Sequence, residues 1–237
     1  DFERREDLLT LARFTSTSGE FVSLKDYVAR MKPGQEAIYT ITGDNAAALK
    51  NSPQLEGFIA KGIEVLLLTD PIDEFWVPTI GTFEKHAFKS VGEAGADLSK
   101  IATDGETKAE EAVAADAIKG VIAKLKTSLG ENVADVRASN RLTGSAVCLV
   151  ADSGGMSLHF ARLLSKHGEA GPVPVKRVLE VNPNHALIKR LDGLSGEAFT
   201  DAAFLLLDQA RIVEGETVPD PTAFARRLSA MLEKSLG

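Results

Sequence analysis

The sequence predicts a mixed α/β protein, α+β overall: a small three-layer α/β unit over residues 1–104 is followed by an α+β unit over 105–237 that ends in a helical bundle. Three observations predict this fold. Short apolar strands alternate with helical segments in the first hundred residues, as in a sheet covered on both faces. A polar break at 103–106 precedes a long Ala/Lys/Glu-rich helix. Two strongly apolar helices then close the chain.

The ends of the elements in the first unit are marked in the sequence. Ser23-Leu24-Lys25-Asp26 resembles a capping box and predicts the start of a short helix. Ile38-Tyr39-Thr40-Ile41 is rich in β-formers and predicts a strand, while residues 45–50 indicate a helix. Ser52-Pro53 supplies an N-cap and an N1 proline for the next helix. Val65-Leu66-Leu67-Leu68 is continuously apolar, so we expect a buried parallel strand that completes a crossover unit.

The second unit mixes helices and strands. Asp220-Pro221 is again an N-cap followed by an N1 proline, which marks the start of the last helix. The expected elements are a helix over 108–126, strands over 135–138 and 146–151, a helix over 155–166, a strand over 177–181, a short helix ending near 191, and final helices over 197–213 and 221–236.

Composition excludes several classes of protein. Of 237 residues, 44% are hydrophobic and 26% charged, so the chain has enough apolar side chains for a core and is not of the disordered type. A net charge of -7 without a concentrated basic run argues against a nucleic-acid partner. No apolar run approaches the roughly 18 residues of a membrane span, so no membrane partner is expected. A single cysteine suits a reducing, cytoplasmic setting.

The motifs of most enzyme classes are missing from the sequence. It has no Gly-x-Gly-x-x-Gly, no phosphate loop, no His-Glu-x-x-His and no Cys-x-x-Cys. We therefore predict no catalytic residue and no metal site. Cys148 lies in an apolar strand and is expected to be a buried, inert thiol. The four histidines are scattered, and each is expected to be a surface or capping residue: His86, His159, His167 and His185.

One acidic cluster leaves an alternative open. Asp70, Asp73 and Glu74 follow the strand at 65–68, and ligands of open α/β sheets bind at such strand ends. A small metal-dependent α/β enzyme is therefore the alternative function. The favoured interpretation is that Asp70-Pro71 caps a helix whose first turn accepts carboxylates through the helix dipole, because no basic or nucleophilic partner lies nearby in the sequence.

Two apolar features are candidates for a surface that binds other proteins. Phe75-Trp76-Val77-Pro78 places two aromatic residues in succession, so they point in different directions on a helix. A second segment follows Gly154-Gly155 and carries one apolar stripe. From periodicity alone this stripe faces a core; a mobile helix that offers an adaptable surface is the other hypothesis. The stripe consists of Met156, Phe160, Leu163 and Leu164.

The last two helices predict a homodimer. Phe204-Leu205-Leu206-Leu207 makes one helix apolar all round a turn, so that helix must be buried on every side. Pairing with the same two helices of a second subunit gives a four-helix bundle, whereas packing on their own unit is the simpler alternative. The expected dimer-interface residues are Phe199, Ala203, Leu206, Ala210 and Val213 on the first helix and Phe224, Leu228, Met231 and Leu232 on the second.

Several segments, in order along the chain, resemble the heat-shock protein 90 family in its bacterial form. Matches to its middle domain are the run from Ser23 to Gln35, Ile38-Tyr39-Thr40-Ile41-Thr42-Gly43, Asn51-Ser52-Pro53, Lys61-Gly62-Ile63-Glu64-Val65-Leu66 and Asp70-Pro71-Ile72-Asp73-Glu74. Matches to its C-terminal domain are Arg141-Leu142-Thr143, Gly155-Met156, Glu180-Val181-Asn182-Pro183-Asn184-His185 and Leu205-Leu206-Leu207-Asp208-Gln209-Ala210.

The resemblance implies a fragment of an ATP-dependent, homodimeric stress-response chaperone. Residues 1–104 would be the end of the middle domain and 105–237 the C-terminal dimerisation domain. ATP and Mg would bind in an N-terminal domain upstream of Asp1, so this fragment is not expected to be an enzyme on its own. The chain opens without an initiator Met, which also suggests that the natural protein extends upstream.

The resemblance also implies partners and contacts. Unfolded or partly folded client proteins are expected to bind Glu74, Phe75 and Trp76 together with the stripe that begins at Met156. Another chaperone is a further expected partner. Pro78 departs from the polar residue of the family pattern. The chain also lacks the Met-Glu-Glu-Val-Asp tail of cytosolic eukaryotic members, so co-chaperones that read this tail are not expected.

Overall fold

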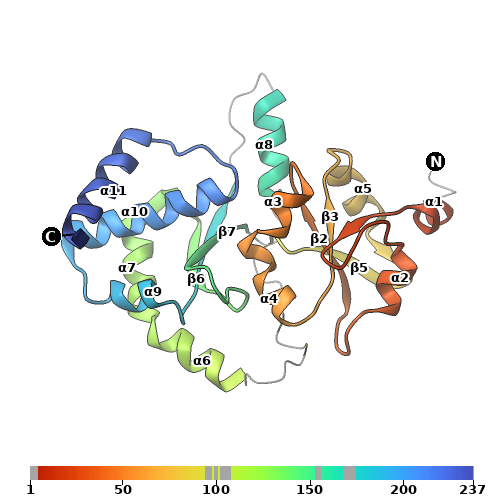
Figure 1. Cartoon of the computed structure of the whole chain (residues 1–237), viewed down its shortest axis with the longest axis horizontal. Helices are drawn as coiled ribbons and strands as arrows, with labels where there is room; N and C mark the ends of the chain where they lie inside the picture. The colour runs from red at the N-terminus through yellow and green to blue at the C-terminus, as the bar shows by residue number, and fades with distance from the viewer. Residues whose placement is uncertain are drawn as a thin grey trace.

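The computed structural model describes residues 5–93, 98, 101, 108–152, 156–167 and 175–236. Two α/β units lie beside each other, and the N- and C-terminal ends lie at opposite sides of the molecule (Figure 1). The predicted breaks at 103–106 and at Gly154-Gly155 fall outside the described residues. The mixed α/β fold class is confirmed, because each unit combines a sheet with helices.

Within the described residues, the first unit holds a five-stranded sheet of order β1-β3-β2-β5-β4. The central strand β2 runs parallel to β3 and β5, and Tyr39 lies opposite Val65. The edge strands β1 and β4 are antiparallel to their neighbours. The predicted parallel pairing of two buried strands is therefore confirmed. The strands are β1 Thr15–Ser16, β2 Ala37–Thr42, β3 Val65–Leu68, β4 Thr82–Phe83 and β5 His86–Ser90.

Helices cover both faces of this sheet. Alternate residues of β3 point to opposite faces, so Val65 and Leu67 join one core while Leu66 and Leu68 join the other. The predicted N-cap at Ser23 is confirmed, since its side chain accepts a hydrogen bond from the backbone of Asp26. The helices are α1 Arg5–Leu11, α2 Leu24–Ala29, α3 Ala46–Lys50, the 3₁₀ turn η1 Pro53–Leu55, α4 Glu56–Ala60 and α5 Asp73–Ile80.

The second unit is built on a three-stranded sheet of order β6-β8-β7 within the described residues. β8 is parallel to β6 and antiparallel to β7. Apolar side chains of α7 and α10 form its core with the sheet. The elements are α6 Lys108–Ala117, α7 Lys119–Leu129, the 3₁₀ turn η2 Gly130–Asn132, β6 Asp135–Ala138, β7 Val147–Ala151, α8 Leu158–His167, β8 Arg177–Val181, α9 Ala186–Leu191, α10 Gly196–Val213 and α11 Pro221–Leu236.

Three local features differ from the expectations. The helix expected over 108–126 is two helices, because the backbone leaves the helical conformation at the buried Ile118. The hairpin of β4 and β5 was not predicted, since Glu84 and Lys85 turn it with φ of 45° and 71° and neither is a typical residue for this conformation. Asp70 does not cap α5; its carboxylate accepts a hydrogen bond from the backbone of Ile72 instead.

No helix in the described part of the chain is long and apolar enough to cross a membrane.

Candidate interaction surfaces

α5 of the first unit and α8 of the second meet through a cluster of polar side chains. Ser157 Oγ donates to the carboxylate of Glu74, at 2.9 Å from either oxygen. His159 Nδ1 lies 3.0 Å from Oε1 of Glu74, and His159 Nε2 lies 3.4 Å from Oδ1 of Asp44. We call this four-residue cluster the α5/α8 clasp. It fixes where α8 stands against the first unit, beside α3 and α5 (Figure 1).

The electrostatics of the clasp favour an ionised Glu74. Burial raises the pKa of Glu74, but hydrogen bonds from His159, Thr42 and Ser157 outweigh it and bring the pKa below its usual range. The expectation that His159 is a surface or capping residue is wrong, because it is 6% exposed and lies between two carboxylates. His185, in contrast, is a cap: its side chain accepts a hydrogen bond from the backbone of Leu187.

Apolar side chains lie next to the clasp on both helices. The rings of Phe75 and Phe160 meet edge to face, with centroids 5.1 Å apart and planes at 86°. Phe75 is 53% exposed. The side of α8 that is buried carries Leu158 and Ala161, so the predicted stripe is not core. We call the half-buried and exposed set the α5/α8 surface: Phe75, Met156, Phe160, Leu163 and Leu164.

Trp76 does not join this surface. Its ring packs at 5.8 Å from Phe14 and 5.6 Å from Phe88, on the other side of α5. Its indole Nε1 donates to Asp73 Oδ1 at 2.5 Å. Successive residues on a helix point about 100° apart, so Phe75 and Trp76 pack against different residues. In this structure, Trp76 stabilises the first unit.

The structure divides the residues that were expected at the dimer interface into two groups. Phe199, Ala203, Leu206 and Ala210 are at most 4% exposed and belong to the core of their own unit, so they have little surface to offer a partner, although Leu206 borders the groove described below. The other five lie at or near the surface: Val213, Leu228 and Leu232 are exposed, while Phe224 and Met231 are half-buried.

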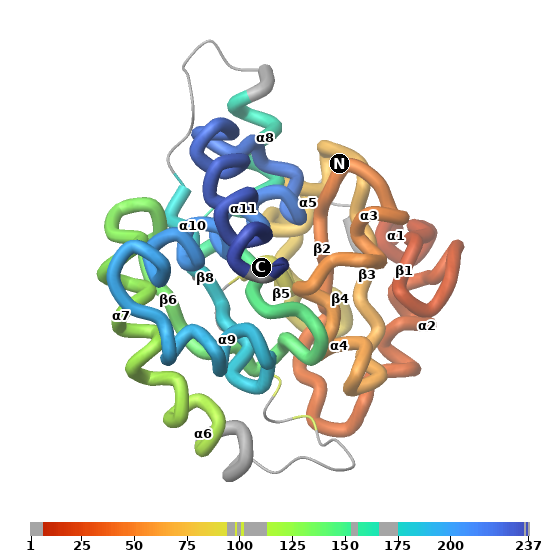
Figure 2. Tube along the Cα trace, turned by 60° about the vertical axis from the view of Figure 1, so that its left-hand side comes forward, coloured from red at the N-terminus to blue at the C-terminus, as the bar shows by residue number. Residues whose placement is uncertain are grey.

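An apolar groove of about 580 Å³ runs between α9, α10 and α11. Figure 2 shows these helices at the front of the second unit. Leu205 and Met231 line it from α10 and α11, and Leu187, which is 44% exposed, lines it from α9. Leu187 was missed, because one leucine in a six-residue helix leaves no periodic signal. We call this feature the α9–α11 groove.

The alternative of a metal-dependent enzyme is not supported. Asp73 accepts hydrogen bonds from the backbone of Asp70 and from the indole of Trp76, while Glu74 turns to α8. The described residues contain no group of three or more His, Cys, Asp or Glu side chains that would hold a metal ion. Cys148 is buried as expected, and burial raises the pKa of its thiol well above the usual value.

Comparison with known proteins decides the family. Residues 1–237 match the family described as "Hsp90 protein". The chain belongs to the Hsp90 family. It is 57% identical over 245 residues to the chaperone protein HtpG of Paramagnetospirillum magneticum and 50% identical over 244 residues to that of Rhodospirillum rubrum, with all of this chain covered in both. These alignments cover 39% of each relative, so the chain spans about two fifths of their length.

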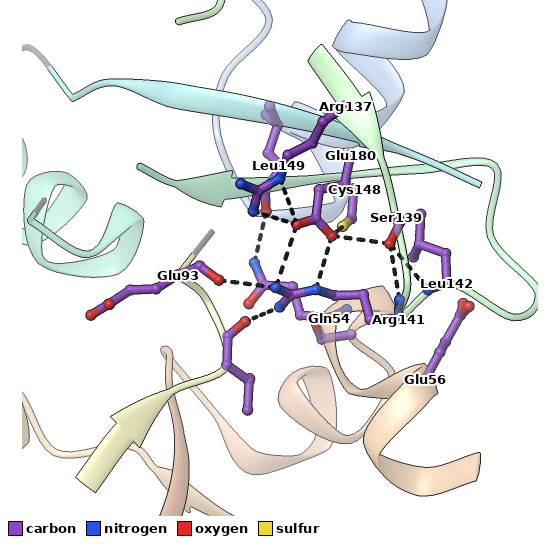
Figure 3. Close-up of polar contacts among 12 residues, drawn as sticks. Gln54, Glu56, Glu93, Arg137, Ser139, Arg141, Leu142, Cys148, Leu149 and Glu180 are labelled. Atoms are coloured by element: carbon purple, nitrogen blue, oxygen red, sulfur yellow. Dashed lines mark hydrogen bonds and ion pairs between the residues drawn. The ribbon is translucent and has the colours of Figure 1, made fainter. Parts of the chain in front are cut away.

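Several of the Hsp90-like motifs meet at the junction of the two units (Figure 3). Arg141 is 1% exposed, and its Nε lies 2.9 Å from Oε2 of Glu180 on β8. The same guanidinium donates to the backbone carbonyls of Val91 and Glu93, where the chain leaves β5. Arg137 adds a second ion pair to Glu180, at 2.8 Å. The ion pairs to Glu180 hold Arg141 in place, and Arg141 in turn binds the first unit through the carbonyls of Val91 and Glu93. Removal of one member would leave a buried charge unpaired, so the network should be sensitive to substitution.

Polar contacts from η1 and α4 complete the junction of this Hsp90 chain. The carboxylate of Glu56 accepts from the backbone N–H groups of residues 143, 144 and 145. Burial raises the pKa of Glu56, but these hydrogen bonds bring it below its usual value. Gln54 Nε2 donates both to the carbonyl of Leu149 and to Glu214, each at 2.9 Å. Gly57 packs on the backbone of Arg141.

The junction also contains a direct backbone link. The N–H of Ala151, at the end of β7, donates to the carbonyl of Gly92 at 2.8 Å, and Ala151 forms a parallel bridge with Glu93. The two sheets are therefore joined by main-chain atoms as well as by side chains.

Proposed function

We propose that this chain is the part of an HtpG-type Hsp90 chaperone that holds client proteins and joins two subunits. The observation that carries the proposal is the α5/α8 surface, where the exposed Phe75 meets the half-buried Phe160 and where Met156, just before α8, is also exposed. Exposed apolar patches of this kind are typical of protein-binding sites, and methionine adapts to partners of varied shape. The names of the relatives, chaperone protein HtpG, support the same function.

The client site is tested by Phe160→Ala. The side chain of Phe160 is half-buried and its ring meets Phe75, so its removal takes away the centre of the surface while Leu158 and Ala161 still hold α8 to the core. We expect the affinity for a permanently unfolded probe, reduced and carboxymethylated α-lactalbumin, to fall at least about tenfold. Fluorescence anisotropy measures this. Unchanged affinity would remove the client site from this surface.

We propose that the α9–α11 groove pairs with the same groove of a second copy. An apolar groove suits an obligate interface, which is more hydrophobic than a transient one, and α11 also exposes Leu228 and Leu232. α10 has 18 residues and so extends about 27 Å, which gives two such helices per subunit enough length for roughly 2,000 Å² of buried surface. Analytical ultracentrifugation tests the pairing: a monomer at micromolar concentration would refute it.

We further propose that ATP and Mg bind in the part of the full-length relatives that this chain does not span, and that the protein works in the cytoplasm. The described residues supply no phosphate loop and no carboxylate cluster for a metal. Calorimetric titration of this chain with ATP and Mg²⁺ should give no binding heat. A measurable heat would place a nucleotide site in this chain.

A further inference from the structure

We propose that His159 and Glu74 are positioning residues for the client surface: they hold α8 on α5, so that side chains from two separate units form one continuous apolar face. This inference rests on the proposed function, because it assumes that the α5/α8 surface binds clients. It adds that neither residue contacts the client. Their work is to set the relative position of Phe75 and Phe160.

The burial of Glu74 supports an internal role. Its side chain is 9% exposed, and both carboxylate oxygens are engaged by α8, through Ser157 Oγ and through the ring of His159. A carboxylate in this arrangement has little surface left for a client. The resemblance to the family implied that Glu74 contacts clients, whereas the geometry points to a residue that acts through α8.

Ser157 connects the clasp to the start of α8. Its Oγ accepts a hydrogen bond from the backbone N–H of Phe160 at 2.9 Å, as an N-cap side chain does, and donates to Glu74. The hydroxyl that caps the N-terminus of α8 therefore also binds the first turn of this helix to α5. Because Phe160 lies in that turn, the position of its ring depends on the clasp.

His159 provides the second tie. Its ring nitrogens face carboxylate oxygens of two different segments, Glu74 on α5 and Asp44 before α3. Hydrogen bonds to an ionised carboxylate such as Glu74 are stronger than those between neutral groups. The ring thus bridges two segments of the first unit and fixes α8 in rotation as well as in distance.

Apolar contacts lie next to the clasp, and these are less directional. The edge-to-face pair of Phe75 and Phe160 tolerates sliding, and Met156 adapts to many shapes. A surface made only of such groups would not keep one arrangement across two units. The hydrogen bonds of the clasp hold the two helices in one arrangement, and the aromatic and sulfur-containing side chains are left to contact the client.

The test compares His159→Ala with His159→Gln in the full chain. Alanine is the best helix former, so this substitution leaves α8 intact but removes both contacts of the His159 ring, to Glu74 and to Asp44. Glutamine retains an N–H donor that reaches Glu74, and it should rescue the function. His86→Ala, on β5 away from the clasp, is the matched control. Binding of carboxymethylated α-lactalbumin and melting temperature are measured for each, with Phe160→Ala beside them.

The position of α8 is measured separately. Spin labels on Thr79→Cys in α5 and Ser165→Cys in α8, both at exposed positions, report the distance between the helices by double electron–electron resonance. We expect His159→Ala to broaden this distance distribution and to weaken probe binding about tenfold, close to the loss of one charge-assisted hydrogen bond. His159→Gln and His86→Ala should keep a narrow distribution and nearly full affinity.

The outcomes separate this inference from the proposed function. If His159→Ala binds the probe like the parent while Phe160→Ala does not, the client surface stands and the positioning role is refuted. If neither variant loses affinity, both ideas fail together. An unchanged distance distribution in His159→Ala, or tighter probe binding by it, also overturns the positioning role, since the clasp would then be either unnecessary or a cover over the surface.

Discussion

The α5/α8 surface and the α9–α11 groove are both apolar, but they are built in opposite ways. The first takes its side chains from two units, contains aromatic rings and a methionine, and is held by a polar clasp. The second lies within one unit, is lined mainly by aliphatic side chains, and stands on helices whose other face is core. In the first surface the clasp holds the two helices in place while the methionine adapts to varied partners, whereas a groove on a packed core keeps one shape.

The largest expected effect separates core from interface within the last two helices. Leu206→Glu places a charge where the side chain is 4% exposed, so we expect the second unit to lose about 4 kcal/mol or more of stability and to unfold in part. Leu228→Glu makes the same change at a residue that is 41% exposed, and it should leave the melting temperature within a few degrees while giving monomers. Calorimetry measures the melting temperature of each variant, and ultracentrifugation measures whether it is a monomer or a dimer. A folded, monomeric Leu206→Glu would restore this residue to the interface.

A substitution at the junction should affect one surface and spare the other. A Cβ on Gly57 would lie 2.7 Å from Cα and 2.8 Å from the carbonyl oxygen of Arg141, so backbone must move. We expect Gly57→Ala to cost about 2 kcal/mol of stability and to weaken client binding, since the proposed client surface takes side chains from both units, while dimerisation persists. Gly120→Ala is the control, because nothing lies within 4 Å of the added atom and it should stabilise α7 by about 0.5 kcal/mol or more. Equal effects on both surfaces would contradict their independence.

Stability should depend on pH through Glu214, which follows α10 and reaches the junction. Burial raises its pKa to about 7, from an ordinary value of 4.5, and the opposing effects of Arg162 and Gln54 are smaller. Between these two values the folded chain holds a proton that the unfolded chain has released. The contribution of Glu214 to the free energy of unfolding is thus fully present below pH 4.5 and is lost as pH rises through 7.

Glu214→Gln should remove this dependence. The free energy of unfolding of the variant, relative to that of the parent, should rise by up to about 3 kcal/mol between pH 4.5 and pH 8, as measured by urea unfolding. Glu197→Gln, at an exposed position of the same helix, is the control and should track the parent. Parallel curves for parent and Glu214→Gln would show that folding does not shift the pKa of this carboxyl group.

The smallest expected effect lies in the turn between β4 and β5. Lys85 has φ of 71°, a conformation that glycine adopts without strain, so Lys85→Gly should stabilise the chain by about 0.5 kcal/mol after the added freedom of the unfolded chain is counted. The turn belongs to neither surface, and client binding and dimerisation should both stay unchanged. A change in either would mean that the first unit communicates with that surface through its sheet edge.

What the sequence predicts well is local, and what it misses is set by contacts between distant residues. Ser23 and Ser52 were identified as caps because a cap is recognised from a few neighbouring residues. The strand at Val65–Leu68 was identified because both of its faces are apolar. Leu206 could not be assigned to a core or to an interface from periodicity, since an apolar helix presents the same pattern to either.

The clasp shows the same limit for the candidate site. His159 and Glu74 are 85 residues apart, and no sequence pattern around either residue predicts that they are in contact. The sequence predicted both helices of the α5/α8 surface as candidates for binding other proteins, but it did not predict that the two helices are in contact. It also placed Trp76 beside Phe75 among the client contacts, whereas the first unit uses the indole as part of its own packing.

The bridge between Glu93 and Ala151 has a mechanical consequence. It is made of main-chain atoms, so sequence drift at these positions leaves it in place, and it joins the exit of β5 to the end of β7. α10 packs on β7. The first unit is therefore coupled to the second sheet through main-chain atoms, and the side chains that pack between β7 and α10 extend this coupling to the helix that lines the α9–α11 groove. The angle between the two units therefore bears directly on the α5/α8 surface, which takes side chains from both of them.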